Sequence, residues 1–427
     1  GSAPPLEVGG GGAGRRGPPP QVQRPGSSAS DRASRSGPGA AAAVRRGGSS
    51  ARAPPGPVNT DDCAEYSDRF LPGYERCRLL GRGACAVVWL ARPAGDARGP
   101  QVAIKQVAKG ATGKRMADVE SARREIALGS RLFHAGGEPK LSTSRNPGIR
   151  HIARLLESHE TKRDVWLVMD YGGTCLTKMA YEIKGEFARG ERLYRVHHLP
   201  TLCAMKRDPQ VLQALVGQLL SALCVLAELG IVHSDIKPDN ILIEEDEQGK
   251  LRGRLIDLGS AFPFESPEGL ALATPEYMPP EALEACAARS APRPGRRSAA
   301  EEGSGQSRSQ SRPWSFDVWS LGAILLELAA GAPLWLSFKC RVADDQRANS
   351  AALGLFAVPG RDPAKILSRQ SEALRQRGLD EVLREAKGVP LDRNGLDLLS
   401  GMLAWNPDER VSPQQALAHP WCRRAAC

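Results

Sequence analysis

The sequence predicts an α+β fold in which strands gather in the first half of the folded chain and helices in the second. Between residues 74 and 169, short runs of β-branched and apolar residues alternate with turns around one helical stretch. Beyond residue 210, segments at 211–229 and 317–328 carry apolar residues at helical spacing. A chain of 427 residues is long enough to bury a large core and to carry tails as well.

Composition and charge separate this folded part from flexible segments. The sequence contains 45 Gly and 33 Pro and has a net charge of +10. Residues 1–57 hold eight arginines against two acids, and residues 284–313 hold six against three, so these segments carry nine of the ten charges. Neither segment has the apolar side chains that offset chain entropy, which predicts a disordered tail at 1–57 and a low-complexity insertion at 284–313. The remaining core is nearly neutral, so no specific nucleic-acid partner is expected.

Cysteine spacing, the length of apolar runs and the composition of the first residues indicate the expected cell compartment. The ten cysteines are scattered, without a metal-binding spacing, which favours a reduced intracellular compartment, cytoplasmic or nuclear. No apolar run approaches the roughly 18 residues of a membrane-spanning helix, so no membrane is expected. The arginine-rich, acid-poor start also fits an organelle transit peptide, although its many Gly and Pro favour a solvated tail. The basic segments are expected to bind, at most, acidic partners.

The ordered chain is expected to begin near residue 66 with strands around a glycine-rich turn. Residues 74–80 form a predicted strand, and residues 81–89, with the letters GRGACAVVW, form a turn that leads into a second strand. Glycines without Cβ let backbone amides approach phosphate oxygens, but two glycines in a turn are weak evidence alone. The strand 102–105 (VAIK) follows, and it places Lys105 behind the turn.

A helix is predicted over residues 119–133, where apolar residues recur near helical spacing. Glu125 follows two arginines and lies on the expected inward side of this helix. The alternative is an ordinary surface glutamate among arginines, and Glu120 is the nearest rival for an inward role. Two further strands are expected at 152–156 and 165–169.

Residues 170–173 (DYGG) end the last of these strands, and residues 180–209 follow as a long basic segment. That segment is expected to be either a substrate or partner surface or a solvated insertion. Its two adjacent histidines have no cysteine or carboxylate at ligand spacing, so a metal site there is not expected.

The densest polar motif follows an apolar helix. Residues 211–229 form that helix, and Gly230 suits its left-handed end. Residues 233–240 read HSDIKPDN, and Asp257 lies seventeen residues beyond Asn240. An acid, a lysine and an amide within six residues, with a second acid on the next hairpin, supply what phosphoryl transfer needs. These are a carboxylate facing the attacking hydroxyl, a cation for developing charge, and oxygen ligands for magnesium.

Seven motifs in order and at compatible spacing over residues 74–421 resemble the eukaryotic protein kinases, and the lysine within the HSDIKPDN stretch resembles their serine/threonine branch. The later motifs are TPEYMPPE at 274–281, DVWSLG at 317–322, and the terminal segments 403–411 and 416–421. The resemblance implies a bilobal kinase-like fold with a small β-rich N-lobe and a larger helical C-lobe. The implied bounds are 66–424 for the domain, about 66–169 for the N-lobe, 170–173 for the hinge and 174–424 for the C-lobe.

The resemblance also implies the roles of the site residues, with ATP and Mg²⁺ as cofactors. Asp235 would orient the substrate hydroxyl and accept its proton, and Lys237 would neutralise the γ-phosphoryl group. Lys105 would contact the phosphates and be fixed by Glu125. The implied magnesium ligands are Asn240 and Asp257. The other implied nucleotide-binding residues are Gly81, Gly83, Val88, Ala103, Met169, Asp170 and Gly172. The implied structural contacts are a brace from Asp317 to the loop 233–240 and a buried pair between Glu281 and Arg410.

Three letters depart from the family pattern. Ser234 stands where arginine is usual, Leu258 where phenylalanine is usual, and Ala86 where a third glycine is usual. The arginine normally meets a phosphate on the segment after Asp257, and Ser234 cannot supply that charge. We therefore expect that phosphorylation of this segment, for example at Ser266, is not required through that contact.

The resemblance implies an ATP-dependent protein kinase that phosphorylates serine and threonine in protein substrates. A pseudokinase or scaffold with the same fold is the alternative, and it predicts the loss of at least one of four groups. All four are present, namely Lys105, Asp235, Asn240 and Asp257.

Overall fold

The computed structural model describes ten ranges of the chain. They are residues 70–83, 86–109, 113–188, 191–265, 273–290, 312–336, 340–343, 351–352, 355–384 and 386–423. The expected tail 1–57, Ser266 and most of the expected insertion 284–313 lie outside these ranges. Helix α6 (Pro280–Ser290) continues into that insertion, so its first seven residues are helical.

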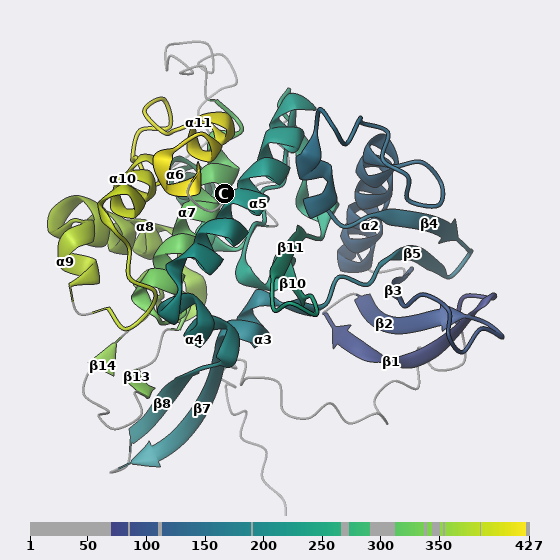
Figure 1. Ribbon diagram of the computed structural model, residues 1–427, viewed down its shortest axis with the longest axis horizontal. Coiled ribbons are helices and arrows are strands. Elements are labelled where there is room, and N and C mark those ends of the chain that lie inside the picture. Colours follow the sequence, from purple (N-terminus) through teal and green to yellow (C-terminus); the bar gives the residue numbers. More distant parts are fainter. Residues whose placement is uncertain are drawn as a thin grey trace, which may run out of the picture. The chain divides into compact units, whose positions relative to one another are not determined.

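The N-lobe is a five-stranded antiparallel sheet with helix α2 (Gly113–Leu132) packed beside it (Figure 1). The strands follow the order β1 (Tyr74–Arg82), β2 (Ala86–Pro93), β3 (Val102–Ala108), β5 (Asp164–Asp170) and β4 (Leu155–Glu160). Apolar residues alternate between two clusters, one around Trp166 and Val168 and the other around Val165 and Leu167, because successive side chains of a strand point to opposite faces. Strand β4 begins three residues later than expected, since Ile152 forms an isolated bridge with Leu255 instead.

The register of this sheet brings expected nucleotide-binding residues onto one face. Val88 pairs with Lys105 across β2 and β3, and Ala103 pairs with Met169 across β3 and β5. Partners in register share a face, and so do residues two apart on one strand. Val88, Ala103, Lys105 and Met169 therefore lie on the same side of the sheet.

The C-lobe is built around helices α5 (Pro209–Glu228) and α7 (Ser315–Ala330). Helix α5 begins where the Asp208 side chain accepts a hydrogen bond from Gln210 N, and it ends before Gly230, which is left-handed at φ 65° as predicted. In α7, fifteen of sixteen residues are buried. The other helices are α3 (Leu176–Ala180), α4 (Pro200–Arg207), α8 (Pro363–Ser371), the π-helix η8 (Glu372–Arg377), α9 (Leu379–Leu383), α10 (Arg393–Met402), α11 (Pro413–Leu417) and α12 (Pro420–Arg423). Together the two lobes confirm the predicted bilobal α+β fold.

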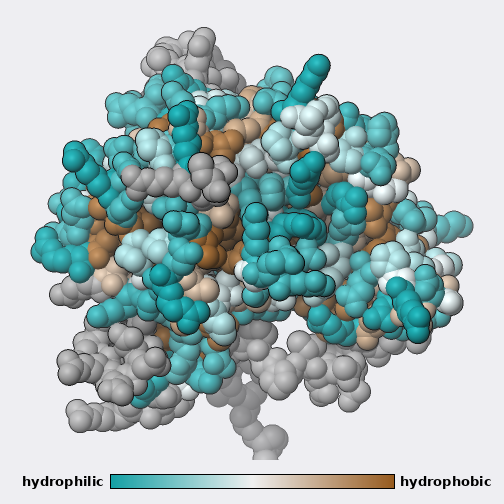
Figure 2. All heavy atoms as spheres, viewed as in Figure 1, coloured by the Kyte–Doolittle hydropathy of each residue, from teal (hydrophilic) through white to brown (hydrophobic). Residues whose placement is uncertain are grey.

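Helix α5 is long and apolar enough to cross a membrane by length and composition alone, which the sequence analysis did not expect. Ten of its twenty residues are buried inside the domain. We therefore interpret α5 as the core helix of the C-lobe. Of the large hydrophobic side chains in the described ranges, Met116 alone is exposed. Figure 2 likewise shows a largely hydrophilic face with apolar atoms in its recesses.

The segment 180–209 is more ordered than a solvated insertion. It forms the hairpin β7 (Tyr181–Ala188) and β8 (Glu191–His198), followed by α4 (Figure 1). Strand β13 (Cys340–Ala343) joins β8 in parallel, and β14 (Ala351–Ala352) completes a four-stranded sheet. Tyr181, Tyr194 and Val196 are buried, so the hairpin is attached to the C-lobe core.

Two small sheets hold the polar loop 233–240. One has the order β11 (Leu251–Leu255), β10 (Ile241–Glu245) and β6 (Thr174–Cys175), and the other pairs β12 (Phe262–Pro263) with β9 (Ile231–Val232). The loop leaves β9 and reaches β10 through the turn η3 (Pro238–Asn240). The remaining 3₁₀ turns are η2 (Pro147–His151), η4 (Leu258–Ser260), η6 (Pro275–Tyr277) and η7 (Pro359–Arg361).

Candidate active site

One carboxylate binds two backbone N–H groups of the loop 233–240. Asp317, near the start of α7, accepts hydrogen bonds from His233 N at 2.7 Å and from Ser234 N at 2.9 Å. Burial raises the pKa of Asp317, and these backbone bonds together with the nearby His233 oppose that rise. Ser234 adopts a left-handed φ of 66°, and the two bonds to Asp317 stabilise that conformation. The brace expected from the sequence is therefore present.

Three polar side chains meet around Asp235. Lys237 Nζ lies 2.6 Å from Asp235 Oδ2, and Asn240 Nδ2 donates to the same oxygen at 3.1 Å. Asp235 Oδ1 accepts from both the backbone N of Thr274, at 3.0 Å, and its hydroxyl, at 2.7 Å. Lys237 Nζ also donates to Thr274 Oγ1 at 2.9 Å. Asp235 is buried, so this network fixes both the carboxylate and the lysine beside it.

Ion pairs made by Lys105 connect the two lobes. Lys105 Nζ lies 2.7 Å from Glu125 Oε2 on α2 and 2.9 Å from Asp257 Oδ1. The Lys105 charge is the main cause that lowers the pKa of Asp257 to about 2, against its partial burial. Burial would lower the pKa of Lys105, but the charges of Asp257 and Glu125 overcome it and hold the pKa above its usual value. Burial raises the pKa of Glu125, and Lys105 opposes that effect.

Helix α2 also contacts the turn that follows Asp257. Arg124 Nη1 donates to Gly259 O at 2.8 Å. A Cβ on Gly259 would lie 2.3 Å from Ser121 Oγ, so a larger residue would require the Ser121 side chain to move. Leu258 is buried in the C-lobe core, which fits the expected apolar role at that position. The position of α2 is thus fixed by contacts to Asp257 and to its neighbours.

The expected pair between Glu281 and Arg410 is present as well. Arg410 donates two parallel bonds to the Glu281 carboxylate, at 2.9 and 3.1 Å. The Arg410 side chain is fully buried and also donates to Ser315 O and Ala404 O. This pair anchors α6, which follows the Thr274 segment, to the end of the C-lobe.

The expected nucleotide-binding residues surround one face of the N-lobe sheet. Gly81 lies at the end of β1 opposite Val88, and Gly83 N donates to Ala86 O at 2.8 Å in the turn. The two residues between them, 84 and 85, lie outside the described ranges. A Cβ on Gly172 would lie 3.1 Å from Leu242, so Leu242 borders the hinge side of this region. The Asp170 side chain pairs with Arg154, which leaves only its backbone for a nucleotide.

The expected magnesium ligands suit that ion. Asn240 Oδ1 and Asp257 Oδ2 accept no hydrogen bond from any described residue. Carboxylate and amide oxygens are the donors that Mg²⁺ prefers. In the described ranges no three His, Cys, Asp or Glu residues group as a transition-metal site would require. His198, in the basic hairpin, lies 2.7 Å from Gly331 O through its Nε2, and this contact gives its ring a structural role.

Three contacts in this region were not foreseen from the sequence. They are the bonds that join Thr274 to Asp235 and Lys237, the bond from Ser234 Oγ to Ser260 O at 2.7 Å, and the bond from Arg124 to Gly259. The TPEYMPPE motif contained a signal for the first, because it places a hydroxyl ahead of a fixed proline turn.

Most of the chain is similar in sequence to known proteins. Residues 74–422 match the protein kinase domain family. Mitogen-activated protein kinase 15 of Rattus norvegicus is 28% identical over 385 residues, covering 86% of this chain and 56% of that protein. Cell division control protein 2 homolog 3 of Trypanosoma brucei brucei is 26% identical over 361 residues, covering 82% of this chain and 91% of that protein. A probable inactive protein kinase of Arabidopsis thaliana is 25% identical over 333 residues, covering 64% and 84%. The chain spans about half the length of the first of these relatives.

Proposed function

The chain belongs to the protein kinase family, and from this premise we propose that it transfers the γ-phosphoryl group of ATP to serine and threonine hydroxyls of protein substrates. The observation that carries the proposal is the convergence of Asp235, Lys237 and Thr274 within one hydrogen-bonded network. The ion pair between Lys105 and Glu125 supports it, because the family needs that pair to hold the phosphates.

The network around Asp235 suggests how an acceptor hydroxyl enters. A carboxylate offers about four acceptor positions. In Asp235 all four are used, two by Thr274 and one each by Lys237 and Asn240. The Thr274 hydroxyl is a neutral donor that can rotate, so it is the partner most easily displaced. We infer that the substrate hydroxyl takes this place and passes its proton to Asp235 Oδ1.

Lys237 and Lys105 stabilise the negative charge of different phosphate groups. Lys237 Nζ lies between Asp235 and Thr274, where it neutralises charge that develops on the transferred phosphoryl group. Lys105 is held by two carboxylates and contacts the non-transferred phosphates. A magnesium ion held by Asn240 and Asp257 would screen the phosphate charge. Because these groups are fixed beforehand, most of the rate acceleration comes from positioning and electrostatics.

Serine/threonine specificity rests on Lys237. Lysine two residues after the catalytic aspartate resembles the serine/threonine branch, and Thr274 bonds to it. Phosphoamino-acid analysis of the product tests this directly. Exclusive phosphotyrosine in the product would overturn the specificity but not the phosphotransfer.

A pseudokinase is the second candidate, because one relative carries the name of a probable inactive kinase. The two candidates are separated by transfer of labelled phosphate from ATP to a generic protein substrate, with Asp235→Asn as the inactive control. We expect transfer by the natural chain and a loss on the order of 100-fold or more in the variant. Nucleotide binding without transfer in both proteins would favour the pseudokinase.

Thr274→Val tests whether the Thr274 hydroxyl positions Lys237 after the substrate hydroxyl has taken its place on Asp235. Valine keeps the shape of threonine but removes the hydroxyl that bridges Asp235 and Lys237. We expect a fall in kcat of about tenfold with nucleotide affinity unchanged, because Lys237 loses the hydroxyl that holds it beside Asp235. An unchanged kcat would show that the Thr274 hydroxyl does not position Lys237.

A further inference from the structure

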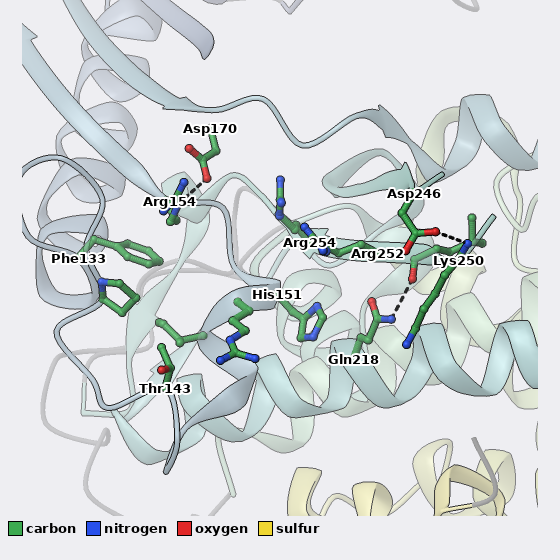
Figure 3. A pocket seen from close by; sticks show the side chains of 14 residues that line it. Phe133, Thr143, His151, Arg154, Asp170, Gln218, Asp246, Lys250, Arg252 and Arg254 are labelled. Atoms are coloured by element: carbon green, nitrogen blue, oxygen red, sulfur yellow. Dashed lines mark hydrogen bonds and ion pairs between the residues drawn. The ribbon is translucent and has the colours of Figure 1, made fainter. Parts of the chain in front are cut away.

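A cavity of about 820 Å³ lies where the end of β5, the start of β4, the turn η2, helix α5 and the β10–β11 hairpin meet (Figure 3). Of the residues placed in the active site, only Asp170 lines it, through the side chain that pairs with Arg154. Its volume falls within the range of pockets that bind small ligands or short peptide segments. The function proposed above does not use this cavity.

The walls of the cavity carry many cations. Along β11 and Lys250, the residue before it, basic residues occupy every second position, so Lys250, Arg252 and Arg254 lie on one face of the strand. All three line the cavity. Other basic residues come from η2 and from Arg154, the residue before β4. The basic lining residues are Arg150, His151, Arg154, Lys250, Arg252 and Arg254.

The neighbouring carboxylates balance only part of this charge. Arg254 and Arg252 share one partner, Glu244, at 3.2 and 3.7 Å. Arg150 and Lys250 form no ion pair with a described residue, and both are exposed. Asp246 lines the cavity, but its carboxylate accepts hydrogen bonds from the backbone N–H groups of its own turn at Gln248 and Lys250. The cavity therefore has an excess of positive charge.

The pKa of His151 responds to the same positive charge. Its Nδ1 lies 2.9 Å from Gly253 O, so the ring is fixed against β11. Burial lowers the pKa of His151, and the charges of Arg252, Arg254 and Arg150 lower it further. An anion that entered the cavity would neutralise those arginines and remove this part of the shift.

We propose that this cavity docks a segment of a partner protein that carries a phosphorylated serine or threonine. Three guanidinium groups, those of Arg150, Arg252 and Arg254, supply planar donor forks that match a phosphate better than ammonium groups do. Figure 3 shows Arg252 and Arg254 between two carboxylates, those of Asp170 and Asp246. Carboxylates at both sides disfavour a continuous polyanion such as a nucleic acid but leave room for one isolated anionic side chain.

Binding of labelled short peptides to the full chain tests the proposal by fluorescence anisotropy. One degenerate pool holds a central phosphoserine, and the control pool holds serine at that position. We expect the phosphorylated pool to bind at least about tenfold more tightly. The double variant Arg150→Ala/Arg252→Ala should remove that preference, because it deletes two of the three forks.

Two further variants keep the result interpretable. Lys162→Ala/Arg163→Ala removes two exposed cations from the β4–β5 turn and should bind the phosphorylated pool like the natural chain. Arg252→Lys keeps the charge without the fork, and it should lose part of the preference even if the double variant folds poorly. Equal binding of the two pools, or full binding by a folded double variant, would overturn the proposal. Tighter binding of single-stranded DNA with the same dependence on Arg150 and Arg252 would replace it with a nucleic-acid site.

Discussion

The hydroxyl of Ser234 donates a hydrogen bond to the backbone oxygen of Ser260 at 2.7 Å, which joins the loop 233–240 to the turn after Asp257. Ser234 is buried, and its own N–H is bound by Asp317. An arginine at this position would need an anion on the later segment to neutralise it, whereas the serine makes a neutral bond to the backbone. The loop is therefore connected to the Asp257 turn without any phosphate.

Removing this bond should have a moderate effect. Ser234→Ala leaves Ser260 O without its partner, so we expect a loss of about 1 kcal/mol in the free energy of unfolding and a several-fold fall in transfer rate. Phosphatase treatment of the natural chain, and Ser266→Ala, should leave the rate nearly unchanged. Steady-state transfer rates and chemical denaturation check both points. Loss of most activity after phosphatase treatment would show that another cation senses a phosphate on this segment.

The contact between Glu125 and Lys105 predicts a larger effect. Glu125→Gln removes the negative charge that holds Lys105 from α2 and leaves Asp257 as its one charged partner. We expect a fall in transfer rate on the order of 100-fold, because the lysine loses its position relative to the phosphates.

Glu120→Gln is the matched control for this substitution. Glu120 lies on the same helix and is exposed, so its variant should transfer phosphate at the natural rate. Comparable losses in both variants would mean that helix charge, not the ion pair, sets the activity. Single-turnover rates at saturating ATP separate an effect on positioning from one on nucleotide binding.

Stability should depend on pH through Glu327, a fully buried carboxyl in α7. Its Oε2 accepts bonds from the Tyr277 hydroxyl at 2.6 Å and from Leu334 N at 3.0 Å. Burial, partly opposed by these two bonds, raises the pKa of Glu327 from 4.5 to about 7. A raised pKa means that the fold holds this proton more tightly than the unfolded chain does. The resulting stability is complete below pH 4.5 and is lost as the pH rises to about 7.

The Glu327→Gln variant isolates this effect, since glutamine stays neutral and keeps an oxygen acceptor. We expect the difference in unfolding free energy between the two proteins to shift by roughly 3 kcal/mol in favour of the variant between pH 4.5 and pH 7.5. Urea denaturation at several pH values measures that difference directly. A difference that stays constant with pH would show that Glu327 ionises freely in the folded protein.

The parts of the molecule that the sequence predicted well are those fixed by local pattern or by a motif. The strands around Lys105 and the core helix ending at Gly230 follow from periodicity, and the brace from Asp317 was implied by the resemblance to protein kinases. The pair between Lys105 and Glu125 was foreseen because the resemblance to protein kinases implied it, and Glu125 lay on the expected inward side of its helix.

Contacts that depend on distant segments were not foreseen. Thr274 and Asp235 are 39 residues apart, and their bond depends on how the later segment folds back. The sequence left two alternatives for the basic segment that contains the hairpin β7–β8, a substrate or partner surface and a solvated insertion. The hairpin is ordered through parallel pairing with β13, more than 140 residues later in the chain, which no local pattern specifies.

The buried pair between Arg410 and Glu281 gives the strongest expected effect on stability. Arg410→Ala would leave the Glu281 carboxylate without its bidentate partner and two backbone oxygens without their donor, so we expect a loss of about 3–5 kcal/mol. Arg410→Lys should recover little, because one ammonium cannot reproduce the planar fork. Glu281→Gln should cost less, since the Glu281 side chain is 34% exposed and water can replace part of the interaction. Thermal and chemical denaturation of the three variants would rank these losses. An Arg410→Lys variant as stable as the natural chain would show that charge alone holds α6 in place.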